Sequence, residues 1–590
     1  MTTPADAPNI NYQWAGLIVE ELIRCGVAGF VISPGSRNSP LSISAARHPA
    51  ARVWVHFDER GAAFFALGLA RQSGRPAVLI CTSGSAVANY LPAAVEASAS
   101  QIPLLIVSAD RPPELIDCGA NQAIEQPGIF GSYVRWEATL PCPTPAIDPA
   151  YVLTTVDQAV ARCVGGNAGP VHLNFMFREP LAPVAGPDAP PHNGAGLTRW
   201  RETAAPWTVH GVESTRLSDH DQAGILDRVQ TCARGLLVFG ALRDPAERAA
   251  ARALSEALGW PVLADVCAGL RGPGAPGSLM RWGDLILLDE TIDDAWTPEF
   301  VIHIGGALTS KRTQQALERW RPAYLRVCLG GTRRDPGHIV TQRCNVAPAD
   351  FCAWLAACLT GYPPGAPPAA WRARDAACDA AIAAWEAQQT GLTEIGAARI
   401  VANQAPEGST VFLGNSMPVR LADSYAWPDR DGVAFVANRG ASGIDGNLAT
   451  AAGLTAASGG PVIALVGDLT ALHDLNSLAL LRTISPPLVV VVLNNDGGGI
   501  FHHLPIAAEH DVFERCFGTP HGLRFGEAAA QFGLRYANPS GAEALGEALD
   551  LALAASSPTL IEVTLGRNAE HAVHLDLRAR LREAMEQARP

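Results

Sequence analysis

Short apolar segments alternate with longer stretches rich in alanine and polar residues through most of the chain. In the first third, the apolar segments are 29–32, 77–80, 104–107 and 171–175. Brief runs of Val, Ile, Leu and Phe are typical of strands buried on both faces of a sheet, and the stretches between them favour helices. The pattern therefore predicts an α/β fold built on parallel sheets.

The same alternation continues to the end of the chain and is interrupted by two segments rich in proline and glycine. These breaker segments are 180–198 and 361–368, and their composition is typical of linkers. The later apolar segments are 236–239, 261–264, 300–304, 410–413, 461–466, 488–493 and 559–563. We therefore expect three parallel-sheet α/β domains, a number that suits a chain of 590 residues. The predicted domains are 1–185, 199–362 and 390–590.

The composition indicates a large folded protein. Hydrophobic residues make up 48% of the chain, charged residues 17%, and the net charge is −13, which disfavours a nucleic-acid-binding surface. No apolar run approaches the roughly 18 residues of a membrane span, and no secretory signal pattern is visible. The 13 cysteines form no Cys-x-x-Cys pair, which favours free thiols over disulfides or a zinc site. We expect a cytoplasmic protein without nucleic-acid partners or integral membrane association.

Polar residues follow two of the later apolar segments directly. Asp468 comes after 461–466, and Asn495 comes after 488–493. Because ligands of open α/β sheets bind at the carboxyl ends of the strands, these two side chains are expected to meet there. Their oxygens, with the backbone carbonyl of Gly497, suit Mg²⁺, which takes few carboxylates when phosphates supply further ligands. The alternative is an ordinary helix start and an ordinary glycine turn.

A glutamate stands at a predicted junction between a strand and a helix near the N-terminus. Glu59 follows the apolar segment 53–57 and precedes the apolar helical stretch 62–70. A carboxylate in a first helical turn is favoured by about 0.3–1 kcal/mol, so a purely structural role is the alternative to a catalytic one. If Phe57, Phe64 and Phe65 enclose Glu59, they raise the pKa of its carboxyl.

The motifs together resemble those of one enzyme family. Gly-Asp-Leu followed by Asn-Asn resembles the metal-binding signature of thiamine-diphosphate-dependent enzymes, with Leu469 at a position that is usually glycine. The full set closely resembles the 2-succinyl-5-enolpyruvyl-6-hydroxy-3-cyclohexene-1-carboxylate synthase family and covers essentially the whole chain in order. Its most specific members are Ser-Pro-Gly-Ser-Arg at 33–37 and Asn-Arg-Gly-Ala-Ser-Gly-Ile-Asp-Gly at 438–446. Further matching segments are 56–60, 109–113, 119–122, 309–312, 415–420 and 498–501.

The resemblance implies the three-domain architecture of the decarboxylase-like thiamine diphosphate enzymes, with thiamine diphosphate and Mg²⁺ as cofactors and Mn²⁺ as an alternative metal. It implies that Glu59 is catalytic and shares a proton with the aminopyrimidine ring of the cofactor. Asp468, Asn495 and Gly497 are then the metal ligands. The implied cofactor-binding residues are Glu59, Ser416, Ile444, Asp468, Asn495, Ile500 and Phe501.

The resemblance also implies the substrates. In this family, 2-oxoglutarate loses CO₂ on the cofactor and the succinyl carbanion equivalent adds to isochorismate, in menaquinone or phylloquinone biosynthesis. Both substrates are dicarboxylates, and arginine binds carboxylates as a permanently charged, bidentate fork. By analogy, Ser36, Arg37, Arg111 and Gln122 line the isochorismate side, and Ser416, Arg420 and Arg439 the succinyl side. The complete implied set is Ser36, Arg37, Arg111, Gln122, Lys311, Arg312, Ser416, Arg420 and Arg439.

The resemblance further implies a homo-oligomer, a dimer or a dimer of dimers, with active sites across the interface.

Two alternatives to this function remain at the level of sequence. The nearer one is another thiamine diphosphate-dependent 2-oxoacid decarboxylase or an acetolactate synthase-like enzyme, and the latter typically holds flavin in its central domain. The more distant one is a noncatalytic nucleotide-binding protein on the same layered scaffold.

Overall fold

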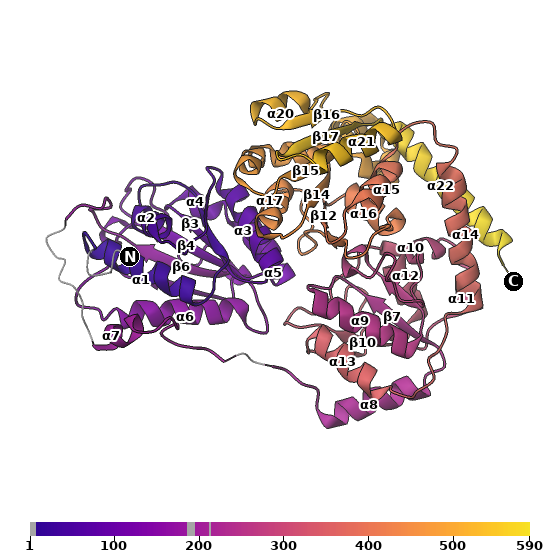
Figure 1. Ribbon diagram of the computed structural model, residues 1–590, viewed down its shortest axis with the longest axis horizontal. Coiled ribbons are helices and arrows are strands. Elements are labelled where there is room, and N and C mark those ends of the chain that lie inside the picture. The colour runs from indigo at the N-terminus through magenta and orange to yellow at the C-terminus, as the bar shows by residue number, and fades with distance from the viewer. Residues whose placement is uncertain (1–6, 186–194, 212–213, 590) are drawn as a thin grey trace. The chain divides into compact units, whose positions relative to one another are not determined.

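The computed structural model describes residues 7–185, 195–211 and 214–589 (Figure 1). The first six residues and residues 186–194 of the predicted linker lie outside this description. The chain separates into two compact units. The first unit combines residues 1–213 with 438–459 and 473–486, and the second combines 214–437, 460–472 and 487–590. Together the described residues form three sheets in which every strand pair is parallel, which confirms the predicted fold class.

The first unit contains a six-stranded sheet in the order β2-β1-β3-β4-β6-β5. Helices α1 and α6 share a buried core with one face of this sheet, through residues such as Phe30 and Val107, and α3 packs against β1 and β3. The strands are β1 (Gly29–Ile32), β2 (Val53–Val55), β3 (Ala77–Cys81), β4 (Leu104–Asp110), β5 (Trp136–Leu140) and β6 (Val171–Met176). The helices are α1 (Ile10–Arg24), α2 (Ser39–Arg47), α3 (Glu59–Ser73), α4 (Ser85–Ala88), α5 (Leu91–Ser100), α6 (Ala150–Val164), α7 (Ala195–Arg201) and α17 (Asn447–Ala457).

A close crossing of α3 and α17 brings distant parts of the sequence together within the first unit. It depends on two glycines, because a Cβ at Gly68 would overlap the Thr450 backbone oxygen and a Cβ at Gly453 would overlap the Phe65 backbone oxygen. The backbones of the two helices can approach this closely only where no side chain intervenes. The crossing holds α3, which begins at Glu59, against the segment that carries the 438–446 motif.

The second unit contains two sheets, of five and six strands. The five-stranded sheet has the order β11-β10-β9-β7-β8, and the six-stranded sheet has the order β13-β12-β14-β15-β17-β16. The strands of the first are β7 (Gly235–Phe239), β8 (Val262–Ala264), β9 (Phe300–Ile304), β10 (Ala323–Val327) and β11 (Gln342–Cys344). Those of the second are β12 (Thr410–Leu413), β13 (Ala434–Val436), β14 (Val462–Gly467), β15 (Leu488–Asn494), β16 (Arg535–Ala537) and β17 (Thr559–Thr564).

Helices surround both sheets of the second unit (Figure 1). The longest is the C-terminal helix α22 (Arg567–Gln587), which packs along α14 (Ala369–Glu386). The other helices are α8 (Asp219–Thr231), α9 (Pro245–Leu258), α10 (Gly283–Ile286), α11 (Ile292–Ala295), α12 (Lys311–Trp320), α13 (Pro348–Cys358), α15 (Glu394–Gln404), α16 (Met417–Tyr425), α18 (Asp468–His473), α19 (His510–Phe513), α20 (Gly526–Gln531) and α21 (Ala542–Leu553). Within the described residues, the helices include none with the length and apolar character that crossing a membrane requires.

The apolar segments predicted as strands are strands in the structure, with ends that differ by one or a few residues. The apolar pattern did not identify β5, β10, β11, β13 and β16. Four of these five are edge strands, β10 being the exception. An edge strand has one neighbour and is partly exposed, so it does not require the continuous apolar run by which a central strand is found. The exposed and half-buried residues of β16 illustrate this.

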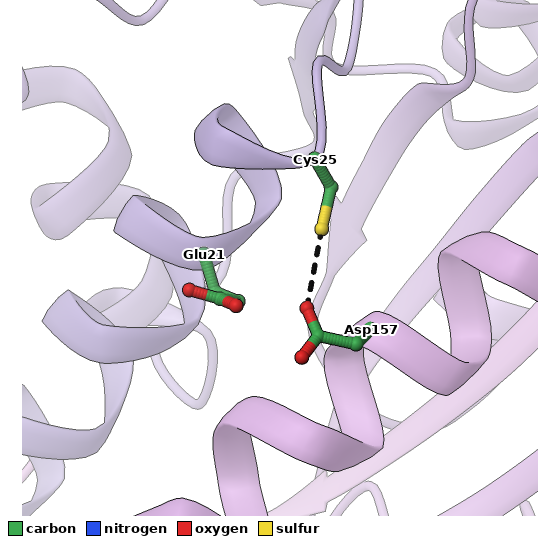
Figure 2. Close-up of side chains that lie close together, drawn as sticks. All are labelled: Glu21, Cys25 and Asp157. Atoms are coloured by element: carbon green, nitrogen blue, oxygen red, sulfur yellow. Dashed lines mark hydrogen bonds between the residues drawn. The ribbon is translucent and has the colours of Figure 1, made fainter. Parts of the chain in front are cut away.

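Within the first unit, a buried pair of carboxyl groups anchors residues 200–208 to α1 and α6. Figure 2 shows that Glu21 of α1, Asp157 of α6 and the Cys25 thiol point toward one another, with Cys25 Sγ donating to Asp157 Oδ1 over 3.3 Å. Trp200 Nε1 donates to Glu21 Oε2 over 2.6 Å, the Trp207 N–H donates to Glu21 Oε1, and the Thr208 N–H donates to Asp157 over 2.7 Å. Burial, and then the neighbouring Asp157, raise the pKa of Glu21 to about 8.

This pair predicts that stability declines as the pH rises. The pKa of Glu21 is higher in the folded chain than its ordinary value of 4.5, so folding takes up a proton between these values. Stability therefore falls as the pH rises from 4.5 to about 8 and levels off above that. Glu21→Gln removes this titration. We expect its thermal midpoint to fall less between pH 6 and pH 8.5 than that of the unsubstituted protein. The exposed Glu202→Gln is the control and should keep the original pH dependence. An unaltered slope in Glu21→Gln would show that Glu21 is already ionised in the fold.

Candidate functional site

Asp468 and the residues after β15 meet at the carboxyl edge of the six-stranded sheet, as their sequence positions predict. Strands β14 and β15 are paired in parallel, with Gly467 opposite Leu493, so the residues that follow them emerge side by side. Asp468 is 2% exposed, and its Oδ2 accepts a hydrogen bond from the Gly497 N–H over 2.8 Å. The structure therefore brings Asp468, Asn495 and Gly497 together at one end of the sheet.

The Asn495 side chain is held in one orientation. Its Nδ2 donates to Glu394 Oε1 over 2.6 Å, and its Oδ1 is buried without a hydrogen-bond partner among the described residues. A buried carbonyl oxygen without a partner costs about 1–3 kcal/mol, so Asn495 Oδ1 is suited to bind a ligand. Oxygen atoms of a carboxylate and an amide are ligands that Mg²⁺ prefers. These residues therefore fit a hard divalent cation.

Asp468 is buried beside the Gly497 N–H and the His521 ring. Burial raises the pKa of Asp468, whereas the Gly497 N–H and the nearby His521 ring, 3.2 Å from Oδ2, act in the opposite direction. The His521 backbone N–H donates to Asp496 Oδ1, which ties the loop after α19 to the loop after β15. Beside Asn495 lies a cavity of about 400 Å³, whose lining includes Asp496, Arg524 and Arg567.

The backbone around these residues takes conformations that favour glycine. Gly497 has a φ of +125°, and a Cβ there would overlap the Gly518 backbone oxygen. Asp496 and Ser416 also have positive φ values, of 64° and 72°. A non-glycine residue in this region costs about 1–3 kcal/mol, and such strain is concentrated at binding and active sites. Ser416 immediately precedes α16, and Arg420 Nη1 donates to its backbone oxygen over 2.5 Å.

Glu59 is the first residue of α3 and is half-buried. Asp58 caps the helix by accepting hydrogen bonds from the backbone N–H groups of Arg60 and Gly61. Arg60 also donates to the His473 backbone oxygen over 2.6 Å, within the first unit. Of the aromatic residues that were expected to enclose Glu59, Phe64 and Phe65 are buried, whereas Phe57 is 62% exposed. Phe57 therefore does not shield the Glu59 carboxyl in this chain.

The predicted isochorismate-side residues lie after strands of the first unit, where Ser83 connects two of them. Arg111 Nη1 donates to Ser83 Oγ over 3.0 Å, and Gln122 Nε2 donates to the Ser83 backbone oxygen over 3.0 Å. Arg37 is buried and donates from Nη1 to the Phe177 backbone oxygen over 2.9 Å. Burial, followed by the positive charge of Arg111, lowers the pKa of Arg37. Ser36, in the loop after β1, is exposed.

The Arg37 guanidinium retains a donor for a ligand. Its Nε is buried without a hydrogen-bond partner among the described residues, and its only ion pair there is a 3.6 Å contact with the exposed Glu179. Two like charges brought close in a partly buried setting favour binding of an anion. Arg37 and Arg111 are therefore suited to a carboxylate ligand.

The remaining predicted residues differ in their surroundings. Lys311, at the start of α12, is exposed, whereas Arg312 is paired with Asp284 and is 3.4 Å from Ser424 Oγ. Ile500 and Phe501 are half-buried after β15, where Phe501 packs against Phe517 with 5.5 Å between ring centroids. In the first unit, Arg439 and Ile444 are half-buried, and Arg420 of the second unit is exposed.

Several residues of these sites were not identified from the sequence. Glu394 contacts Asn495 and His521 contacts Asp468, but neither Glu394 nor His521 belongs to a motif with a recognisable spacing. Glu96 was not among the predicted site residues either, and its carboxylate accepts hydrogen bonds from the backbone N–H groups of Gly440 and Ala441 over 2.9 and 2.6 Å. It thereby holds the backbone next to Arg439. Ser83, which accepts hydrogen bonds from Arg111 and Gln122, was also not predicted.

Three family models match the chain in succession. They are described as the N-terminal TPP binding domain of thiamine pyrophosphate enzymes, matching residues 13–129, the middle domain, matching 193–413, and the C-terminal TPP binding domain, matching 414–563. Thiamine pyrophosphate is thiamine diphosphate. The N-terminal match includes Glu59, and the C-terminal match includes Asp468 and Asn495.

Similar proteins carry the name that the sequence motifs suggested. A 2-succinyl-5-enolpyruvyl-6-hydroxy-3-cyclohexene-1-carboxylate synthase from Rubrobacter xylanophilus is 45% identical, over 97% of this chain and 98% of its own length. Proteins of the same name from Salinibacter ruber and Chlorobium phaeobacteroides are 42% and 41% identical, over 99% and 98% of this chain and 98% and 99% of their own lengths. With this similarity along the whole chain, the protein belongs to the 2-succinyl-5-enolpyruvyl-6-hydroxy-3-cyclohexene-1-carboxylate synthase family of thiamine-diphosphate-dependent enzymes.

Proposed function

We propose that this chain is a thiamine diphosphate-dependent transferase that decarboxylates 2-oxoglutarate and adds the succinyl unit to isochorismate. The products are 2-succinyl-5-enolpyruvyl-6-hydroxy-3-cyclohexene-1-carboxylate and CO₂, and the pathway is menaquinone or phylloquinone biosynthesis. The observation that carries this proposal is the near-full-length identity of 45% to a synthase of that name. The buried Asp468–Asn495 site supports it independently, because it offers oxygen ligands at a strand edge.

The cofactor supplies the electron sink for decarboxylation and transfer when it is bound, and the chain binds and orients it. Asp468, Asn495 and the Gly497 carbonyl would hold Mg²⁺, or Mn²⁺ in its place, against the diphosphate. Ser416, Ile444, Ile500 and Phe501 are proposed as further cofactor contacts. Glu59 is proposed to hold the proton that it shares with the aminopyrimidine ring. Its place at a helix start, where the N-terminal dipole favours a carboxylate, supports this role.

The substrate carboxylates are proposed to bind to cationic residues of the chain. The buried Arg37 Nε, which has no hydrogen-bond partner in the described part of the chain, and the nearby Arg111 support a carboxylate on the isochorismate side. Ser36 and Gln122 are proposed to complete that side. Arg420, Arg439 and Ser416 are proposed on the succinyl side, and Lys311 and Arg312 as further ligands. For Arg312, a substrate carboxylate would have to compete with or join Asp284.

We also propose the organisation of the protein in the cell. The family resemblance favours a homodimer or a dimer of dimers whose active sites lie across the interface, and domains at 1–185, 199–362 and 390–590. All 13 cysteines are free thiols, which supports a reducing, cytoplasmic location.

The proposed reaction is tested by its product. Purified protein supplied with 2-oxoglutarate, isochorismate, thiamine diphosphate and Mg²⁺ should form a compound with the mass of the named product, together with CO₂. Omission of isochorismate should abolish that compound. Formation of acetolactate from pyruvate, with a yellow flavin-containing protein, would instead identify an acetolactate synthase-like enzyme.

Glu59→Gln should reduce CO₂ release from 2-oxoglutarate by about 10²–10⁴-fold, the range typical of losing an acid–base group. Thiamine diphosphate affinity, measured by calorimetry in Mg²⁺, should change little because the diphosphate and metal contacts are retained. Glu543→Gln is the control, since Glu543 is an exposed glutamate in the first turn of α21. Near-normal turnover of Glu59→Gln would refute the assigned role.

Arg37→Lys should raise the KM for isochorismate by about tenfold or more, because it replaces a bidentate fork by a point charge. The affinity for thiamine diphosphate should not change. Arg162→Lys, near the end of α6, is the matched control. Equal KM values for isochorismate in Arg37→Lys and the unsubstituted enzyme would exclude Arg37 from the substrate site.

A further inference from the structure

The amide of Asn495 can serve as a metal ligand in only one of its two orientations. Its Oδ1 has lone pairs for a cation, whereas its Nδ2 carries two hydrogens and repels one. A half-turn of the terminal amide exchanges these atoms while changing the shape of the side chain very little. A site that uses Asn495 therefore requires a second group that distinguishes the two ends of the amide.

Glu394 is placed to make that distinction. It is the first residue of α15 and is 3% exposed, and its Oε1 accepts a hydrogen bond from Asn495 Nδ2 over 2.6 Å. In the reversed orientation, two oxygen acceptors would face each other at this distance inside the protein, which is strongly disfavoured. With Nδ2 held by Glu394, Oδ1 points to the opposite side, where it has no hydrogen-bond partner among the described residues.

Glu394 is itself fixed by its position at the start of a helix. Its backbone N–H donates to Glu570 Oε2 over 2.9 Å, and Thr393 Oγ1 caps the helix by accepting the Gly396 N–H over 3.0 Å. His574 Nε2 lies 3.9 Å from the second carboxylate oxygen. The N-terminal end of the α15 dipole also favours a negative charge here. The carboxylate is therefore a rigid acceptor.

The glycines after Asn495 complete the arrangement. A Cβ at Gly499 would overlap Asn495 Nδ2, so a side chain at this position would displace the amide from Glu394. The neighbouring asparagine is held in a similar way, because Nδ2 of Asn494 donates to Glu562 Oε1 over 2.6 Å. The two consecutive asparagines are thus each oriented by a different buried glutamate.

We infer that Glu394 is a positioning residue of the metal site, which holds the Asn495 amide so that Oδ1 faces the divalent cation. This inference rests on the proposed function, because it takes Asp468 and Asn495 as metal ligands. Glu394 lies 101 positions from Asn495 and acts on the cation only through it. Glu394 contributes by orienting the neutral ligand atom Asn495 Oδ1 toward the cation. Removing a group that orients a metal ligand typically lowers metal affinity by about 10–100-fold.

The test is Mn²⁺ binding in the presence of thiamine diphosphate. Binding is measured from the loss of the electron paramagnetic resonance signal of free Mn²⁺. Glu394→Met keeps the approximate size of the side chain but removes both acceptors, and it should weaken Mn²⁺ binding by about 10-fold or more. Glu394→Gln retains an acceptor oxygen and should stay within about threefold of the unsubstituted protein. If Glu394→Met does not fold, Glu394→Ala takes its place. Equal Mn²⁺ affinity for the folded Met or Ala variant and the unsubstituted protein would overturn the inference.

Two further variants separate positioning from a general structural role. Thr393→Ala removes the cap of the same helix without touching Asn495, and it should lower the thermal midpoint while leaving Mn²⁺ affinity unchanged. Asn495→Asp presents two equivalent oxygens, so in this background removal of the Glu394 carboxylate should no longer weaken Mn²⁺ binding. A loss of affinity that is the same with and without the Asn495→Asp substitution would refute positioning.

Asp468→Ala tests the metal site itself. With Glu394 unchanged, this substitution should abolish Mn²⁺ binding, because Asp468 is the proposed charged ligand. If the unsubstituted protein does not bind Mn²⁺ with thiamine diphosphate, or if Asp468→Ala binds it normally, the proposed metal site is wrong and the inference fails with it. If the Glu394 variants bind Mn²⁺ as well as the unsubstituted protein does, and Asp468→Ala does not bind it, the metal site stands and only the positioning role is excluded.

Discussion

The parallel pairing of β14 and β15 is the constraint on which the proposed metal site depends. The hydrogen-bonded register places Gly467 opposite Leu493, so Asp468 and the Asn494–Gly497 segment leave the sheet at the same edge. A shift by one residue would turn every side chain of a strand to the other face, and a strand with apolar neighbours on both faces tolerates such a shift poorly. The contact between Asp468 and the Gly497 N–H closes the two loops over this edge. The position of the site is therefore determined by a rigid ladder and not by flexible loops.

A second constraint is the cost of burying polar groups. Asp468, Asn494, Asn495, Glu394 and Glu562 are all at least nine-tenths buried. Each must find partners, and the hydrogen bonds from Asn495 to Glu394 and from Asn494 to Glu562 satisfy most of this requirement. Within the described ranges, the Oδ1 atom of Asn495 is left over. A network that is complete except at one oxygen is well organised to receive a cation, since little of the protein has to rearrange.

The cationic residues fall into two groups that sequence motifs do not distinguish. Arg37 and Arg111 are held by backbone oxygens and by Ser83, contacts that orient a guanidinium without neutralising its charge, and the ion pair of Arg37 with the exposed Glu179 is a 3.6 Å contact. Arg312 instead faces the Asp284 carboxylate, and Ser310 and Ser424 donate to the same carboxylate. The first arrangement preserves the attraction for a substrate anion, whereas the second already satisfies much of it. Arginines in matched motifs thus differ in how much of their charge is available to bind a substrate anion.

The sequence by itself determined the fold class, most of the central strands and the edge of the sheet at which Asp468 and Asn495 stand. These follow from local patterns, because a strand buried on both faces requires a continuous apolar run and its polar end is visible in the chain. It also contained motifs specific enough to indicate the enzyme family. Four of the six edge strands and the interior strand β10 were missed, and partial exposure leaves edge strands such as β16 without that pattern. Tertiary structure alone decided which groups orient the functional side chains. Glu394 and Asn495 are 101 positions apart, and the close approach of Gly68 and Gly453 joins helices from opposite parts of the chain. Hydrogen bonds and close packing depend on distances of a few ångströms between remote segments. Local periodicity carries no record of those distances, so they appear only when the chain is folded.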